Sequence, residues 1–166
     1  MGPEAEADRV RLQHVRNRPL GFDREQLVVL PLNDDLRAQY APFKEELKRQ
    51  PGVLNATGTS LVPTKGSSTY NFLLEETTES QSLDVYFVDA DFLDTYGISL
   101  IAGEGFRETL TENPAEYQFL VNEAALQAWG LADHPSGVVG KRLSDAADGQ
   151  IIGVVKNFHT HSLHDP

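Results

Sequence analysis

The chain is poor in the residues that carry much covalent and metal chemistry. It has no cysteine, one methionine and one tryptophan among its 166 residues. Without thiols there are no disulfides, no thiolate catalysis and no zinc sites built on cysteine. No run reaches the ~20 apolar residues that cross a bilayer, and the first residues lack the apolar core of a signal peptide. The sequence therefore presents neither a cysteine site nor a membrane segment.

Basic residues are also scarce. Lysine and arginine number 14 against 25 aspartates and glutamates, which gives a net charge of -11 at pH 7. Such a surface repels nucleic acid phosphates and anionic lipid headgroups, so we expect no nucleic acid partner. The charge favours solubility and suits a basic partner. The apolar content of 40% and charged content of 23% are ordinary for one globular domain, or for one built of two small subdomains.

The first part of the chain predicts a strand, a helix and a second strand. The apolar run 27–30 indicates a strand buried on both faces. Asn33 is placed to cap the next helix, and the Pro-Gly pair at 51–52 ends that helix. The residues 53–62 then form the second strand. Together they predict a βαβ unit. The helix carries one apolar stripe, made of Leu36, Tyr40, Phe43 and Leu47.

The middle of the chain predicts a hairpin and a short helix. Residues 72–74 read as a short strand, 75–81 as a polar hairpin loop and 83–88 as a half-exposed strand with alternating apolar residues. Asp91 then caps a short helix, and Gly97 ends it where a left-handed conformation is needed.

The last part of the chain predicts a strand, a helix and a second hairpin. Residues 117–121 form the strand, Asn122 caps the helix 123–129, and Gly130 terminates it. Segments 138–143 and 150–155 then pair across a loop of Asp, Ala and Gly.

These elements give a mixed α+β fold with about seven or eight strands and four helices. We expect a mixed sheet with βαβ units, in which the first unit and the last strands share one sheet. The middle, from about 63 to 83, is expected to form a separate inserted lobe.

One cluster has the composition of a metal site. His159, His161 and His164 could bind zinc or copper as neutral imidazoles, although Asp165 is the one carboxylate nearby. We favour adventitious nickel or zinc binding over a native site there. Asp89, Asp91 and Asp94 resemble the start of a calcium loop but lack the glycine and glutamate spacing of an EF-hand, so Asp91 is better explained as a helix cap.

No residue set predicts catalysis. The Gly103-Glu104-Gly105 turn lacks the context of a phosphate loop, and the serines lack a nucleophile elbow. Trp129, Phe92 and Phe106 read as core residues. With no nucleophile, base and orienting group together, we predict no catalytic, cofactor-binding or metal residue, no cofactor, and no enzyme activity.

Five short segments, taken in order, resemble one family. Together they are similar to the extracytoplasmic, or periplasmic, core domain of MacB/FtsX-like permeases of bacterial ABC transporters. Each segment is weakly specific alone, and their order makes the resemblance fairly specific. The segments are 88–98, 100–106, 120–125, 137–143 and 151–159.

The resemblance implies a domain organisation. Residues 1–22 are expected to form a stalk helix and turn that follow a membrane span outside this sequence. Residues 23–166 form the core domain, porter-like with the inserted lobe around 63–83, and the resemblance implies that this domain is truncated at its C-terminal end. Glu104 stands where the family usually has an arginine, so no role of that arginine is carried over.

The resemblance also implies a function. Such domains belong to permeases of the bacterial inner membrane that work as dimers with a cytoplasmic ATP-binding subunit or domain. They are non-catalytic and transmit ATP-driven conformational change to cargo, or to a periplasmic adaptor or other envelope partner. The alternative is a stand-alone envelope binding domain, or a metal-dependent hydrolase that uses His159, His161 and His164.

Overall fold

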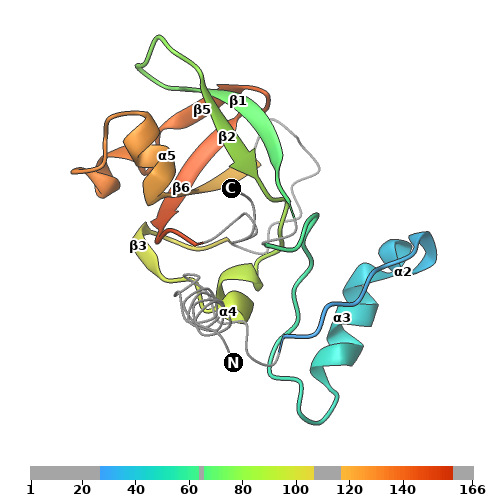
Figure 1. Ribbon diagram of the computed structural model, residues 1–166. Helices are drawn as coiled ribbons and strands as arrows, with labels where there is room; N and C mark the ends of the chain where they lie inside the picture. The colour runs from blue at the N-terminus through green and yellow to red at the C-terminus, as the bar shows by residue number, and fades with distance from the viewer. Residues whose placement is uncertain (1–26, 64–65, 107–116, 159–166) are drawn as a thin grey trace, which may run out of the picture.

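A computed structural model describes residues 27–63, 66–106 and 117–158. They form a curved sheet with short helices against it, while α2 (Asp34–Ala38) and α3 (Tyr40–Lys48) project away to one side (Figure 1). We call α2 and α3 the arm, and the sheet with its other helices the body. Within these ranges no helix has the length and apolar character needed to span a membrane.

The body is built on one six-stranded sheet. Its strand order is β2-β1-β5-β6-β3, and β4 also pairs with β6. All pairings are antiparallel except that of β4 with β6, which is parallel. The strands are β1 (Ser68–Leu74), β2 (Gln81–Val85), β3 (Leu100–Gly103), β4 (Tyr117–Asn122), β5 (Arg142–Asp145) and β6 (Gly149–Val155).

Strand β6 organises this sheet because it pairs with three others. Its first residues pair with β5, its last residues pair with β3, and β4 runs along its other edge. The neighbouring backbones come close: a Cβ on Gly149 would lie 2.1 Å from the Tyr117 carbonyl oxygen, and one on Gly153 would lie 2.5 Å from that of Glu104. Only glycine fits such approaches without a shift of the backbone.

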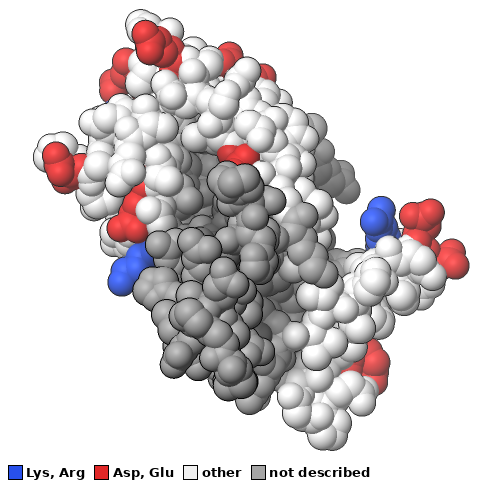
Figure 2. Space-filling model, viewed as in Figure 1, with Lys and Arg blue, Asp and Glu red and all other residues white. Residues whose placement is uncertain are grey.

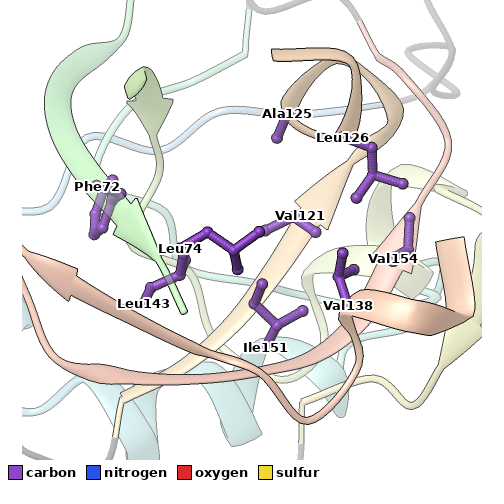
Figure 3. Packing of buried hydrophobic residues seen from close by; sticks show 9 residues of the cluster. All are labelled: Phe72, Leu74, Val121, Ala125, Leu126, Val138, Leu143, Ile151 and Val154. Carbon is purple, nitrogen blue, oxygen red and sulfur yellow. The ribbon is translucent and has the colours of Figure 1, made fainter. Parts of the chain in front are cut away.

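The main core lies on one face of the sheet, where η2 (Pro135–Val138) and α5 (Glu123–Ala128) cover it (Figure 3). Ile151 and Val154 of β6 are fully buried, and Phe72 meets Phe119 edge-on with ring centroids 5.5 Å apart. Truncating such a buried aliphatic side chain to alanine typically costs about 2–5 kcal/mol. The cluster consists of Phe72, Leu74, Val121, Ala125, Leu126, Val138, Leu143, Ile151 and Val154.

A second, smaller cluster joins α4 (Phe92–Tyr96) to the end of β6. Phe92, Tyr96 and Ile98 pack there against Val155. Gly97 ends the helix in the left-handed region with φ 65°, as the sequence predicted. The end of β6 and α4 thus belong to one packed unit.

The predicted asparagine caps are confirmed. The Asn33 side chain accepts a hydrogen bond from the Leu36 amide at 2.9 Å, and Asn122 accepts one from Ala125 at 3.0 Å. The first helix, expected to be continuous, breaks at Gln39 into α2 and α3.

The predicted βαβ unit is wrong. Residues 27–30 form no strand, and Val28, Val29 and Leu30 are 82%, 49% and 52% exposed. Residues 53–62 contribute one isolated bridge, from Thr59 to Val88. An apolar run shows what a segment could bury, but a strand also needs a partner for its backbone groups. Within the described ranges 27–30 has none.

The β1–β2 hairpin is predicted correctly, and its location differs from the expectation of a separate lobe. Strand β1 pairs with β5, so residues 68–83 belong to the same sheet as the last strands. The described ranges hold six strands instead of seven or eight. The mixed α+β class is as predicted, and the division into 1–22 and 23–166 stays a prediction.

Candidate functional site

Two lysines of the arm meet two aspartates of the body. Lys44 Nζ donates to Asp89 Oδ2 at 2.8 Å and also pairs with Asp91. Lys48 Nζ lies 3.3 Å from Asp91 Oδ2. Two positive charges thus face two negative ones. We call these four residues, with Tyr40, Thr57 and Gly58, the polar joint.

Asp89 is the centre of the polar joint. Its Oδ2 accepts hydrogen bonds from Lys44, from the Tyr40 hydroxyl, and from the Gly58 amide at 3.0 Å. Its Oδ1 accepts from the Thr57 hydroxyl and from the Asp91 amide at 3.1 Å. A carboxylate offers about four lone-pair sites, so Asp89 has no acceptor capacity to spare.

The charges of the joint are stabilised by their mutual contacts. Burial alone would raise the pKa of Asp89, but its hydrogen bonds, with that from Lys44 the strongest, outweigh burial and lower this pKa. The hydrogen bond from Lys44 likewise lowers the pKa of Asp91 against a smaller effect of burial. For Lys44, burial favours a lower pKa, and the hydrogen bonds to both aspartates raise it above its usual value.

Burial separates the joint from an ordinary surface ion pair. The side chains of Lys44 and Asp89 are 11% and 22% exposed. The Tyr40 ring covers Gly58 so closely that a Cβ there would lie 2.6 Å from the Tyr40 oxygen. Burial raises the pKa of Tyr40, and its hydrogen bond to Asp89 raises it further. The phenol therefore stays protonated and keeps donating.

This arrangement suits a mechanical link and not proton transfer. A general base needs a pKa near the working pH and a free lone pair. Asp89 has a lowered pKa and a full set of donors. What the joint can do is to hold α3 at a fixed place on the turn before α4.

A second feature, an apolar groove of about 990 Å³, lies in the body. It is lined by the consecutive residues 82–88, which include all of β2 except Gln81, by all of β4, and by core residues such as Phe72 and Leu143. Phe92, Phe106 and Phe158 also line it. We call it the β2–β4 groove.

The structure corrects the interpretation of Asp91. It occupies the N-cap position of α4, but its side chain makes no capping hydrogen bond and instead faces Lys44 and Lys48. Within the described ranges, no three histidine, aspartate or glutamate side chains are arranged to hold a metal ion. At Asp89 and Asp91 an ammonium group occupies the place where a cation would bind.

Lys44, Tyr40 and Thr57 are partners of these aspartates that were not predicted from the sequence. A signal for two of them was present, because Tyr40 and Lys44 are four residues apart and share a helix face. In the sequence, however, Tyr40 fits an apolar stripe, and Lys44 fits the C-terminal end of a helix, where a basic residue is favourable.

The other residues singled out in the sequence are the three histidines, Glu104, Trp129 and Phe92. His159, His161 and His164 lie outside the described residues, so a metal site there stays a prediction.

Glu104 is exposed, and its amide donates to the Ile152 carbonyl at 3.0 Å, which extends the β3–β6 pairing. Its neighbour Gly103 has φ 75°, and a Cβ there would lie 2.2 Å from the same carbonyl oxygen. Trp129 and Phe92 pack on the core clusters, as expected.

The five family-like segments meet around β6. The Asn157 side-chain oxygen accepts a hydrogen bond from the Ala124 backbone amide at 2.8 Å. The Asn157 backbone amide donates to the Glu123 carboxylate at 2.9 Å. The Gly140 amide donates to the Ile151 carbonyl at 2.8 Å. Segments 100–106 and 120–125 contribute β3 and β4, the two other neighbours of β6. The segments therefore supply β6 with its neighbours β3 and β4, and they include Asp89 and Asp91 of the polar joint.

Comparisons with known proteins found solved structures alone. No family model matches the chain, and no curated protein does. A domain described as part of a permease protein from Porphyromonas gingivalis is 27% identical, with a TM-score of 0.48, over 70% of this chain and 44% of that chain. The periplasmic region of MacB from Actinobacillus actinomycetemcomitans is 18% identical, with a TM-score of 0.49, over 78% of this chain and 59% of that one.

One of these structures is described as a permease domain and the other as a periplasmic region of MacB. The chain spans less than two thirds of either of them, at 44% and 59% of their lengths. Both TM-scores lie below 0.5, so the residues of the polar joint and the ordered segments are what points to a function.

Proposed function

We propose that this chain is the extracytoplasmic domain of a bacterial ABC transporter permease. In this proposal the domain is non-catalytic and passes ATP-driven movement to cargo or to an envelope partner. The ATP chemistry belongs to a cytoplasmic subunit or domain, reached through membrane helices outside this sequence. A second permease protomer and a periplasmic adaptor are the other proposed partners, and the inner membrane is the proposed location.

The observation that carries the proposal is the burial of Lys44 between two aspartates. Asp89 and Asp91 belong to the segment 88–98, which most resembles the permease family. Lys44 belongs to the arm, which lies closer in the sequence to the proposed stalk, 1–22. The joint therefore connects the part of the chain nearest the membrane to the body, as a force-transmitting domain requires.

A path for movement follows from the packing. A pull on α3 acts on Asp89 and Asp91, which stand directly before α4. Phe92 and Tyr96 of α4 pack on Val155, at the end of β6. Since β6 pairs with three strands, a displacement of α4 reaches the whole sheet. Packed elements transmit such shifts as rigid units.

The test uses the full-length transporter in lipid, with its ATP-binding partner. Spin labels at Glu45→Cys in α3 and Asp133→Cys in the body report their separation, and both positions are exposed. This segment has no cysteine of its own. We expect the distance distribution between the labels to shift between the ATP-bound and the nucleotide-free protein, because the arm carries the movement.

A pair inside the body, Glu79→Cys with Asp133→Cys, provides the control and should give one distribution in both states. The same distribution for the arm pair with and without ATP would contradict force transmission. A native protein with no membrane helices flanking this segment would contradict the permease assignment itself.

A further inference from the structure

Both ends of the described chain pack against the same small cluster. It is the second core cluster, in which Phe92 and Tyr96 of α4 are 3% and 6% exposed, and we call it the α4 cluster. Leu27, the first described residue, and Phe158, the last, are partly buried against it. The chain that leads into the arm and the chain that leaves β6 thus meet at α4.

Residues 156–158, which we call the exit segment, are held by contacts to both sides. The Lys156 amide donates to the Ser99 carbonyl at 2.9 Å, just after α4. The Phe158 ring lies edge-on to the Phe92 ring with the centroids 6.3 Å apart, within the range of favourable aromatic pairs. The hydrogen bonds of Asn157 to the start of α5 add to these contacts. The exit segment is therefore docked at a defined place on α4.

Helix α4 also fixes the aspartates of the polar joint. The Phe92 amide donates to the Asp89 carbonyl at 3.2 Å, and the Thr95 amide donates to the Asp91 carbonyl at 2.9 Å. The Thr95 hydroxyl donates to the same Asp91 carbonyl at 2.7 Å. The position of Phe92 therefore sets where the two carboxylates lie when Lys44 reaches them.

The arm brings positive charge to an acidic body. The whole chain carries a net charge of -11, and acidic side chains are spread over the body on the face shown in Figure 2. Lys44 and Lys48 contact the joint aspartates from the arm. Because the energy of such contacts depends on the distance between the charges, a shift of α4 changes how firmly the arm is docked.

Helix α4 is too short to keep its shape alone. It has five residues, and isolated helices shorter than about 12 residues are marginal in water. Its order therefore depends on the groups around it, which include the lysines of the arm on one side and the exit segment on the other. Where two elements order the same helix, the docking of one lowers the entropy cost of docking the other.

We propose that α4 couples the arm to the exit segment, so that the two dock together and release together. Phe158 is a positioning residue in this coupling: its ring holds Phe92, and Phe92 holds the joint aspartates where Lys44 meets them. In the transporter, a pull on the arm then loosens the chain that leaves β6. That use of the coupling rests on the proposed function, whereas the coupling itself is a property of the 166-residue protein.

The test measures amide hydrogen exchange by NMR in the 166-residue protein. Phe158→Ala should make the α3 amides exchange at least about fivefold faster, because the joint aspartates lose their fixed positions. Lys44→Met should make the Lys156 amide exchange faster by a similar factor, because coupling between two sites is reciprocal. The Ile151 amide, which donates to the Lys141 carbonyl within the body, reports opening of the sheet and should change less than either.

Two further variants separate positioning from a general loss of packing. Phe158→Tyr keeps the ring and should leave the α3 exchange rates as they are in the unmodified protein. Tyr117→Ala removes a ring that is 43% exposed and is not part of the α4 cluster, and it should also leave those rates unchanged. Circular dichroism checks that each variant is folded, and Phe158→Leu replaces Phe158→Ala if the alanine variant is not.

Any of three results would overturn the coupling: unchanged α3 exchange in Phe158→Ala, equally fast α3 exchange in Tyr117→Ala, or an increase at Ile151 as large as that in α3. Unchanged Lys156 exchange in Lys44→Met would overturn it as well, since a coupling in one direction alone breaks reciprocity. None of these results bears on the permease assignment, which the spin-label distances in the full-length transporter test separately.

Discussion

Lys44 shows why the polar joint could be predicted only in part. Its helix was correctly predicted, and Tyr40 and Lys44 share a face because they are four residues apart. The segment 88–98 was also identified. What a local pattern cannot supply is the contact between residues 44 and 89, since it depends on how two distant elements pack. The two aspartates keep Lys44 charged, with 11% of its side chain exposed.

Replacing Lys44 with methionine should release the arm. The change keeps the length of the side chain and leaves two aspartates facing each other without their ammonium partner. Hydrogen bonds to charged groups contribute about 1.5–3 kcal/mol each, so we expect amide exchange in α3 to become roughly tenfold to a hundredfold faster. Hydrogen exchange read by mass spectrometry measures this.

The control is Lys141→Met, which removes the pair between Lys141 and Glu76, whose side chain is 76% exposed. Exposed pairs contribute about 0–1 kcal/mol, so exchange near Lys141 should change little. Equal effects of the two substitutions would mean that the joint is an ordinary surface pair.

At the scale of elements, helices were predicted better than the arrangement of strands. Asn33, Asn122, Gly97 and Gly130 mark helix ends through their own backbone and side-chain chemistry, so one residue carries the signal. A strand depends on a partner elsewhere in the chain. Nothing local to Phe72 indicates that it pairs with Asp145, and nothing local to 27–30 shows that these residues lack a partner among the described strands.

The two asparagine caps should differ in their effect on stability. Asn122→Ala removes the cap of α5, which buries Ala125 and Leu126 in the main core, so we expect a loss of about 1 kcal/mol in the free energy of unfolding. Asn33→Ala removes the cap of α2, which buries no residue, and should leave that free energy unchanged. Urea unfolding followed by circular dichroism measures both, and a reversed order would contradict the separation of arm and body.

At the scale of the whole molecule, the arm is attached to the body partly by charge, which makes its position depend on pH. The pKa values of Asp89 and Asp91 are lowered in the folded protein, and that of Lys44 is raised. A lowered carboxyl pKa gives stability that is present above the unfolded value, about 3.9, and is lost as pH falls through the folded value. A raised lysine pKa gives stability that is present below about 10.4 and is lost as pH rises through the folded value.

We therefore expect the arm to stay docked between about pH 5 and 9 and to loosen below about pH 4. The spin-labelled pair Glu45→Cys with Asp133→Cys measures this in the 166-residue protein, as a broadening of the distance distribution at acid pH. In the same labelled protein carrying Asp89→Asn, the distribution should already be broad at pH 7. A distribution that stays narrow at pH 3 would show that packing alone holds the arm.

The central place of β6 has a consequence for the time that this sheet needs to form. Strands leave the ribosome in sequence order, so the β1–β2 hairpin is complete at Val85, whereas β6 ends at Val155. At about 5–20 residues per second, the 70 residues between them take roughly 4–14 s. Until then β1 lacks a settled partner, because β5 pairs with β1 on one side and with β6 on the other, and a lone hairpin is marginal in water. Synthesis therefore leaves a window in which the unpaired edge of β1, a strand that carries Tyr70 and Phe72, is open to other chains.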